Sequence, residues 1–202
     1  MKITAIKAQV RRAGRFSVFV DEKYAFSLSE SALLESKLSL GQEVNHEAVG
    51  KFKQLSAEDK LYSNALHFTA LRPRSEWEIE QYLKRKQASP AFAETILNKL
   101  SKNGLVNDEQ FALRWVESRR LLKPTSRRRL TQELRAKHVA SEIIDQVLEV
   151  DETDEREVLR ELVAKKIKQV KYRDDKLKLM QYLARQGFGY EDIKSVLNEE
   201  KS

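Results

Sequence analysis

The feature that most constrains the fold of this 202-residue chain is a phrase that occurs three times. Residues 72–86 read RPRSEWEIEQYLKRK, residues 123–137 read KPTSRRRLTQELRAK, and residues 172–186 read YRDDKLKLMQYLARQ. The copies align with Ser75, Ser126 and Asp175 in register, at spacings of 51 and 49 residues. A period of this size is typical of proteins that are built from one structural unit in tandem.

Each copy of the phrase predicts the start of an amphipathic helix. Ser75, Ser126 and Asp175 are residue types that favour the N-cap position, and Glu78 completes a capping box with Ser75. Pro73 is incompatible with a helix interior, so it separates this helix from the one before it. Apolar residues four positions apart predict one buried face in each copy: Ile79 and Leu83, Leu130 and Leu134, Leu179 and Leu183.

The residues around each phrase repeat as well. Upstream lies a longer amphipathic stretch, whose apolar residues in the three copies are Leu61, Ala65 and Leu66; Phe111, Ala112, Trp115 and Val116; and Val158, Leu159 and Leu162. Downstream, after a turn, lie the apolar pairs Ile96/Leu100, Ile144/Leu148 and Ile193/Leu197. We therefore predict three units of three helices each, over residues 51–104, 105–150 and 151–202. One such unit buries little surface, so neighbouring units are expected to stack.

The first 50 residues have a different pattern. Residues 3–10, 16–20 and 24–28 predict two or three antiparallel strands in a small meander, and residues 21–23 are a turn candidate. Ser29 is expected to cap a short helix that ends near Leu38. A sheet of this size is marginal alone, so we expect it to pack on a helix that starts near His46. The predicted fold class is mainly α, with three tandem three-helix repeats preceded by a small antiparallel β-containing domain of residues 1–50.

Composition narrows the class of protein. Charged residues make up 34% of the chain while glycine and proline are scarce, which favours helices with solvated faces over a sheet-rich fold. The absence of cysteine excludes disulfides and thiolate metal sites and is compatible with a reducing cytosol. The first residues lack the apolar segment of a signal peptide, and no apolar run approaches the roughly 18 residues of a membrane span. We expect a cytoplasmic protein.

A search for catalytic or metal-binding constellations gives little support for an enzyme. The three histidines lie on different predicted elements, and none is spaced four residues from another. Residues 186–189 (QGFG) are interpreted as a helix end and a turn, because no strand precedes them as in a phosphate-binding loop. The acidic runs at residues 107–109 and 151–155 are interpreted as helix caps with acids in the first turn. We therefore predict no catalytic residue, no metal site and no cofactor.

Basic residues give the stronger functional signal. The net charge is +7, and it is +1 over residues 1–50, +4 over 51–104, +2 over 105–150 and zero over 151–202. Three consecutive arginines at the start of a predicted helix oppose its dipole, which indicates selection by an external partner. A basic face of this kind suits a phosphate backbone or an acidic protein groove, and the alternative is a solvated surface. The candidate binding residues are Arg72, Arg74, Lys84, Arg85, Lys86, Arg119, Arg120, Lys123, Arg127, Arg128, Arg129, Arg135 and Lys137.

Four aromatic residues are weak candidates for stacking on nucleic acid bases: Trp77, Tyr82, Phe92 and Trp115. Trp115 shares a predicted helix face with Phe111 and is assigned to the core. Trp77 lies two residues before Ile79, so it is expected to point away from the core and to be exposed. None of the four is included in the predicted binding surface.

Two stretches of the sequence resemble the signature of the RecX family. One is residues 72–79 (RPRSEWEI), followed by Leu83 and Lys86, and the other is residues 105–112 (LVNDEQFA), followed by Arg119. Residues 21–28 (DEKYAFSL) look like part of the N-terminal extension of longer members. The resemblance covers most of the chain and is looser in the third copy, where proline and serine are replaced by Arg173 and Asp175.

The resemblance implies a fold, a partner and an activity. Members of the RecX family are tandem three-helix repeats in an elongated, curved molecule, and they bind the RecA recombinase, chiefly as its filament on DNA. The resemblance thus implies a monomeric, non-enzymatic protein that mostly inhibits the ATPase and recombinase activity of RecA in recombinational DNA repair and the SOS response. The alternative is a helical-repeat DNA-binding protein that acts independently of RecA. The sequence is compatible with contacts of the basic residues to RecA, to DNA phosphate or to both.

Overall fold

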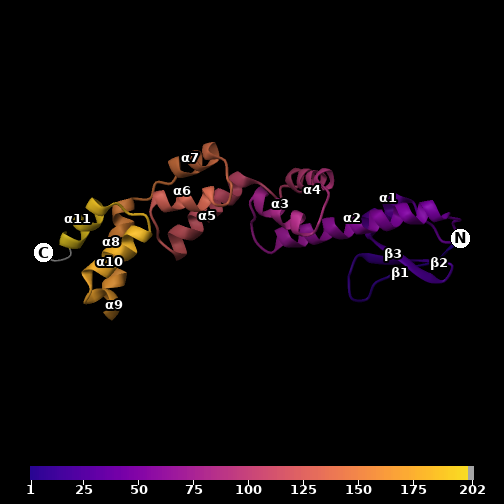
Figure 1. Ribbon diagram of the computed structural model, residues 1–202, viewed down its shortest axis with the longest axis horizontal. Coiled ribbons are helices and arrows are strands. Elements are labelled where there is room, and N and C mark those ends of the chain that lie inside the picture. Colours follow the sequence, from indigo (N-terminus) through magenta and orange to yellow (C-terminus); the bar gives the residue numbers. More distant parts are fainter. Residues whose placement is uncertain (200–202) are drawn as a thin grey trace. The chain divides into compact units, whose positions relative to one another are not determined.

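The structure, a computed structural model, describes residues 1–199 as three strands and eleven helices (Figure 1). The strands are β1 (Ile3–Ala8), β2 (Arg15–Val20) and β3 (Lys23–Ser29). The helices are α1 (Glu30–Ser36), α2 (His46–Ala70), α3 (Glu76–Arg85), α4 (Pro90–Lys102), α5 (Asp108–Leu122), α6 (Arg127–Arg135), α7 (Ser141–Glu149), α8 (Glu155–Ile167), α9 (Val170–Arg173), α10 (Lys176–Arg185) and α11 (Tyr190–Glu199). The predicted fold class, mainly helical behind a small antiparallel sheet, is confirmed.

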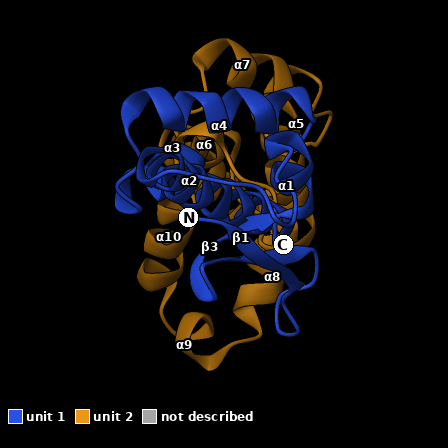
Figure 2. Ribbon diagram, turned by 90° about the vertical axis from the view of Figure 1, so that its right-hand side faces the viewer, with its two compact units in different colours: residues 1–72, 79–105 blue, residues 73–78, 106–202 orange. Residues whose placement is uncertain are grey.

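The chain divides into two compact units, which Figure 2 colours separately. Unit 1 contains residues 1–72 and 79–105, and unit 2 contains residues 73–78 and the chain from residue 106 onward. The predicted segment boundary after residue 50 lies inside α2, and the division into four segments stays a prediction. Residues 200–202, the end of the predicted third repeat, lie outside the described residues. Among residues 1–199, no helix combines the length and the apolar character needed to cross a membrane.

The N-terminal sheet is the predicted antiparallel meander, with the order β1-β2-β3. The predicted turn between β2 and β3 is built from Asp21 and Glu22, whose φ angles are 47° and 67°. Positive φ at both central residues matches the twist of paired strands, although glycine and asparagine are the usual residues there. Two hydrogen bonds from backbone N–H groups hold the turn: Lys2 N to Asp21 Oδ1 at 2.8 Å and Glu22 N to Thr4 Oγ1 at 2.9 Å.

The sheet packs on α2, as predicted, and α2 begins at His46. Arg15 of β2 and Asp59 of α2 form a buried ion pair at 3.0 Å. The Arg15 guanidinium also donates to Ser27 Oγ at 3.0 Å, and Asp59 Oδ2 accepts from Ser29 N at 2.8 Å. The additional hydrogen bonds to both groups help to offset the cost of desolvating this buried pair, which joins the sheet to the helix.

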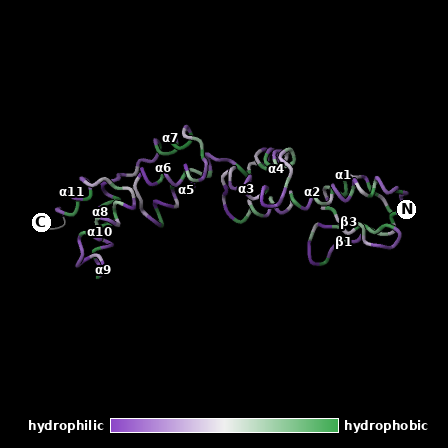
Figure 3. The backbone as a smooth tube through the Cα atoms, viewed as in Figure 1, coloured by the Kyte–Doolittle hydropathy of each residue, from purple (hydrophilic) through white to green (hydrophobic). Residues whose placement is uncertain are grey.

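The helices of each repeat bury the apolar positions that the period predicts. All six residues of the middle-helix pairs (Ile79, Leu83, Leu130, Leu134, Leu179 and Leu183) are buried, and so are the downstream pairs. Along the helices in Figure 3, green hydrophobic and purple hydrophilic residues follow one another within short distances, as expected when one face of each helix is covered. Two details differ: Leu66, predicted to face the core, is exposed, and the short helix α9 was not predicted.

The predicted caps are present at the middle helix of each repeat. Ser75 Oγ accepts a hydrogen bond from Glu78 N and Glu78 Oε2 accepts one from Ser75 N, both at 3.4 Å, which is the predicted capping box. Ser126 Oγ accepts from Arg129 N at 3.1 Å, and Asp175 Oδ1 accepts from Lys178 N at 2.9 Å. The start of each of these helices is therefore encoded locally.

We expect Ser75→Ala to lower the free energy of unfolding by about 1 kcal/mol, because it removes a cap from a helix N-terminus. Ser75 is completely buried, so water has no access to the N–H group that loses its acceptor. Urea unfolding followed by circular dichroism measures the change. The control is Ser89→Ala at the exposed cap of α4. If Ser89→Ala lowers the free energy of unfolding as much as Ser75→Ala does, burial of the cap does not add to its contribution.

Candidate interaction surface

The candidate surface centres on the start of α6, where three consecutive arginines follow a buried cap. Ser126 is completely buried and holds Arg129 N, and Glu155 Oε1 at the start of α8 accepts a hydrogen bond from Arg127 N at 3.1 Å. These acceptors satisfy N–H groups of the first turn and offset the unfavourable position of the arginines. Arg127 and Arg128 are exposed, and no ion pair joins either of them to another residue of the described chain.

Next to this turn, Glu133 accepts hydrogen bonds from basic side chains of two helices, α5 and α6. Its carboxylate accepts hydrogen bonds from Arg119 Nε at 2.6 Å, from Arg129 Nε at 3.4 Å and from Trp115 Nε1 at 3.0 Å. The Arg119 guanidinium also lies 4.5 Å from the centre of the Trp115 ring, and Lys137 Nζ lies 5.5 Å from it. Trp115, assigned to the core from its sequence, is half-buried and carries these cations on its ring.

Lys137 and Arg74 meet at a second carboxylate in unit 2. Lys137 Nζ donates to Glu78 Oε1 at 3.1 Å, and Arg74 NH1 lies 3.9 Å from the same oxygen. Glu78 therefore acts twice, as a partner of the Ser75 cap and as an anion between two basic side chains. These two predicted binding residues are held in internal ion pairs.

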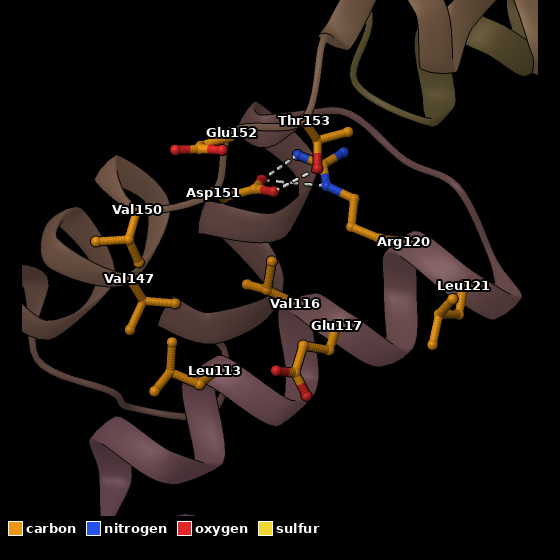
Figure 4. Close-up of a pocket in the computed structure, with 10 residues that line it drawn as sticks. All are labelled: Leu113, Val116, Glu117, Arg120, Leu121, Val147, Val150, Asp151, Glu152 and Thr153. Atoms are coloured by element: carbon orange, nitrogen blue, oxygen red, sulfur yellow. Dashed lines mark hydrogen bonds and ion pairs between the residues drawn. The ribbon is translucent and has the colours of Figure 1, made fainter.

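Arg120 points into a different environment, between α5 and the segment that links α7 to α8 (Figure 4). Its guanidinium donates to Asp151 Oδ2 at 2.5 and 3.1 Å and to the carbonyl oxygen of Thr125 at 2.7 Å. The pair borders a groove of about 570 Å³ whose walls include Val116 and Val147. Arg120 on α5 thus links the segment before α6, through Thr125, and the segment after α7, through Asp151. The sequence did not indicate this role.

The remaining candidates lie on exposed ends of helices. Lys84 and Arg85 end α3 and Lys86 follows it, with Lys86 Nζ 5.8 Å from the centre of the Tyr82 ring. Arg135 ends α6 and Lys123 follows α5. All of these, together with Arg72, are exposed. Cations in the last turn of a helix interact favourably with its dipole, so these positions also have a local explanation.

The structure therefore separates the predicted residues into two groups. Five of them contact carboxylates inside unit 2: Arg74, Arg119, Arg120, Arg129 and Lys137. The other eight are exposed, with Lys123, Arg127, Arg128 and Arg135 in unit 2 and Arg72, Lys84, Arg85 and Lys86 in unit 1; Arg129 of the first group is exposed as well. That all thirteen residues line one continuous face stays a prediction.

Two carboxylates of this region have lowered pKa values. Burial raises the pKa of Glu133, but the hydrogen bonds from Arg119 and Trp115 and the charges of Arg119 and Arg129 outweigh it. Burial likewise raises the pKa of Asp151, and the hydrogen bonds from Arg120 and Thr153 together with the Arg120 charge outweigh it. Both side chains are therefore ionised in the folded chain under neutral conditions.

We expect the free energy of unfolding to decrease between about pH 5 and pH 2. A carboxylate whose pKa is lowered by folding stabilises the chain above its unfolded pKa, and this contribution is lost as the pH falls through the folded pKa. Urea unfolding at a series of pH values measures the effect. Glu133→Gln removes one of the carboxylates whose pKa is lowered by folding, so the decrease for this variant should be shallower. A decrease as steep as that of the parent chain would contradict the assignment.

One aromatic contact was missed from the sequence. Trp77, expected to be exposed, is half-buried, and its ring stacks on His138 with centroids 4.4 Å apart and planes at 19°. His138 follows α6 with a φ of 58°, the left-handed conformation that directs its ring toward the phrase of the preceding repeat. The only sequence signal was the alignment of His138 with Gly187 in the third copy, a position at which a helix ends.

Comparison with family models finds four matches along the chain. The Regulatory protein RecX N-terminal domain matches residues 1–45. The first, second and third three-helix domains of RecX match residues 62–100, 107–148 and 153–197. The matches follow the sheet and the three repeats in order.

Full-length relatives agree with these matches. The "Regulatory protein RecX" of Bacillus subtilis is 29% identical over 201 residues, which cover 98% of this chain and 76% of the relative. The "Regulatory protein RecX" of Lactobacillus johnsonii is 30% identical over 193 residues, which cover 94% of this chain and 71% of the relative. A crystal structure of a regulatory protein RecX superposes with a TM-score of 0.73 at 27% identity, and the match covers 98% of both chains.

Proposed function

This chain belongs to the RecX family of regulatory proteins, and from that premise we propose that it is a non-enzymatic regulator that binds RecA and its DNA filament. In this proposal the bound chain mostly inhibits the ATPase and recombinase activity of RecA, within recombinational DNA repair and the SOS response in the cytoplasm. The observation that carries the proposal is the exposed Arg127–Arg128 pair at the start of α6. Its guanidinium groups are available to carboxylates or phosphates of a partner.

The arrangement of unit 2 supports such an interaction physically. Planar guanidinium groups bind carboxylates and phosphates through paired hydrogen bonds, which gives geometric specificity as well as charge. The neighbouring cations Arg119 and Arg129 are oriented by Glu133, so fewer rotamers are lost when a partner binds. A monomer with several such contacts on repeated helices gains affinity through effective concentration on a filament with many identical sites.

The test is an ATPase assay with purified RecA on single-stranded DNA. The turnover of ATP should fall as the chain is added, and it should fall before the chain exceeds RecA in concentration. An unchanged rate at equal concentrations of the two proteins would contradict the proposal. The assay also reports the direction of the effect, since a rise in turnover would indicate activation of RecA and would contradict inhibition.

A second candidate function is a helical-repeat DNA-binding protein that acts independently of RecA. The net charge of +7 and the repeated three-helix units favour it. This function requires a steeply salt-dependent affinity for bare DNA that does not change when RecA is present. If the chain binds RecA directly in the absence of DNA, and inhibition of RecA depends on that contact, DNA binding independent of RecA is excluded as the main activity.

A further inference from the structure

The third repeat has a net charge of zero, yet its charges are strongly separated. Residues 165–178 contain seven basic and two acidic residues, whereas the rest of residues 151–202 contains five basic and ten acidic residues. The basic residues lie at the end of α8, on α9 and at the start of α10. We call this set the lysine tip: Lys165, Lys166, Lys168, Lys171, Arg173, Lys176 and Lys178.

The lysine tip lies where the chain turns from α8 to α10 through α9, at the end of the α8–α10 pair in both views (Figures 1 and 2). Six of its seven side chains are on exposed residues. The exception, Lys166, is half-buried, with Nζ 4.7 Å from the Tyr182 ring centre and 5.8 Å from that of Tyr172. Lys171 Nζ lies 5.3 Å from the Tyr172 ring centre. Two tyrosines thus hold two of the cations in place.

Two cations of this repeat outside the tip, both on α8, are neutralised by pairing, whereas most of the lysine tip is not. Away from the tip, Arg156 pairs with Glu199, and Arg160 pairs with Glu199 at 3.2 Å and with Glu157 at 3.1 Å. In the tip, the two acids Asp174 and Asp175 pair with Arg173 and Lys178.

Five lysines of the tip have no carboxylate partner in the described part of the chain: Lys165, Lys166, Lys168, Lys171 and Lys176. Like charges that lie together repel one another, so this arrangement is unfavourable for the isolated chain. It becomes favourable when these lysines neutralise the phosphates of a polyanion, because the counterions condensed on the polyanion are then released into solution.

We propose that the lysine tip is a second binding surface, which contacts the sugar-phosphate backbone of nucleic acid without reading its sequence. The tip contains six lysines and one arginine, whereas nine of the thirteen candidates in the first two repeats are arginines. Lysine is depleted at protein interfaces and arginine is enriched there. Phosphate neutralisation requires only positive charge at suitable distances, so this composition favours a nucleic acid over an acidic protein.

Tyr172 and Tyr182 do not add base recognition to this surface. Tyr172 is 7% exposed and belongs to the core of the repeat, and Tyr182 is half-buried against that core. Stacking on a base requires an open ring face, so the contact is expected to be electrostatic. This inference rests on the second candidate function, direct binding to DNA, and deepens it by assigning the contact to the third repeat.

The test measures the binding of the full chain to a fluorescent oligo(dT) by anisotropy, without RecA, over a series of salt concentrations. The variant is Lys165→Gln/Lys168→Gln/Lys176→Gln, which changes exposed positions outside the core. The slope of log K against log salt should become shallower by about 2, which is about 0.7 for each of three lost phosphate contacts on a single strand. The affinity at low salt should fall on the order of ten-fold.

The matched control is Lys53→Gln/Lys60→Gln/Lys194→Gln, which removes three exposed lysines away from the tip that, like those of the tip variant, have no ion pair within residues 1–199. Both variants have a net charge of +4 instead of +7, so only position differs between them. The proposal predicts near-parental affinity for the control. Equal losses in both variants, or an unchanged slope in the tip variant, would overturn it. So would a tip variant that binds oligo(dT) normally but loses binding to RecA, because the surface would then be a protein contact.

Discussion

The variant Arg127→Glu/Arg128→Glu is expected to lose at least about ten-fold in potency as an inhibitor of RecA ATPase, which corresponds to about 1.4 kcal/mol of binding free energy. Both side chains are exposed at the start of α6 and are engaged in no ion pair within residues 1–199. Glutamate in the first turn of a helix interacts favourably with the dipole. Helicity and melting temperature should therefore stay at the parental values.

The control for this variant is Arg11→Glu/Arg12→Glu, because Arg11 and Arg12 are also consecutive and exposed. Both variants change the net charge from +7 to +3. Inhibition by the control should stay near the parental level if the position of the charge matters. If the α6 variant inhibits as well as the parent chain, the surface that binds RecA lies elsewhere. If both variants lose inhibition equally, the effect is one of total charge.

The two proposed surfaces make opposite predictions for the same pair of assays. The α6 variant should lose inhibition of RecA and keep its affinity for oligo(dT), because the lysine tip is intact. The tip variant should lose affinity for oligo(dT). It should keep its inhibition of RecA, because the arginines of α6 are intact. The failure of one proposal is therefore distinguishable from the failure of the other.

The parts of the fold that the sequence predicted depend on local signals. Ser75, Ser126 and Asp175 are caps within three residues of the N–H groups that they satisfy. The apolar pairs depend only on the helical period, and repetition of the pattern made each copy support the others. The short helix α9 escaped prediction because its four residues are too few for a hydrophobic period to be recognised.

The parts of the site that the sequence could not predict depend on distant pairings. Arg120 and Asp151 are 31 residues apart, and Lys137 and Glu78 are 59 apart, yet both pairs are in contact. A sum of charges treats these side chains as available to a partner, whereas the fold uses them internally. The same kind of sum gave zero for the third repeat and hid the lysine tip.

Gly187→Ala is the glycine substitution from which we expect the largest loss of stability in the described chain. Gly187 follows α10 with a φ of 93°, a conformation that is unfavourable for alanine. A Cβ atom at this position would lie 2.2 Å from Ser126 Oγ and 3.0 Å from Arg129 N. The backbone N–H of α6 cannot move aside as a flexible side chain can, so the junction itself must shift.

This junction joins the second and third repeats through one carbonyl group. The oxygen of Gln186 accepts hydrogen bonds from Ser126 N at 3.1 Å and from Ser126 Oγ and Thr125 Oγ1 at 3.0 Å each. Ser126 and Thr125 are buried, so their donors have no access to water once the carbonyl moves away. We expect the free energy of unfolding to fall by about 2–5 kcal/mol, as the sum of left-handed strain and overpacking.

Gly104→Ala separates the two contributions, and urea unfolding followed by circular dichroism measures both variants. Gly104 also has a positive φ, 68°, but a Cβ atom there meets nothing within 4 Å. Its loss should be about 1–2 kcal/mol, from strain alone. The double variant Gly187→Ala/Ser126→Ala removes the closest clashing atom, so its loss should be smaller than the sum of the two single losses. Equal losses for Gly187→Ala and Gly104→Ala would show that the junction tolerates the added methyl group, and that close packing at Gln186 does not hold the two repeats together.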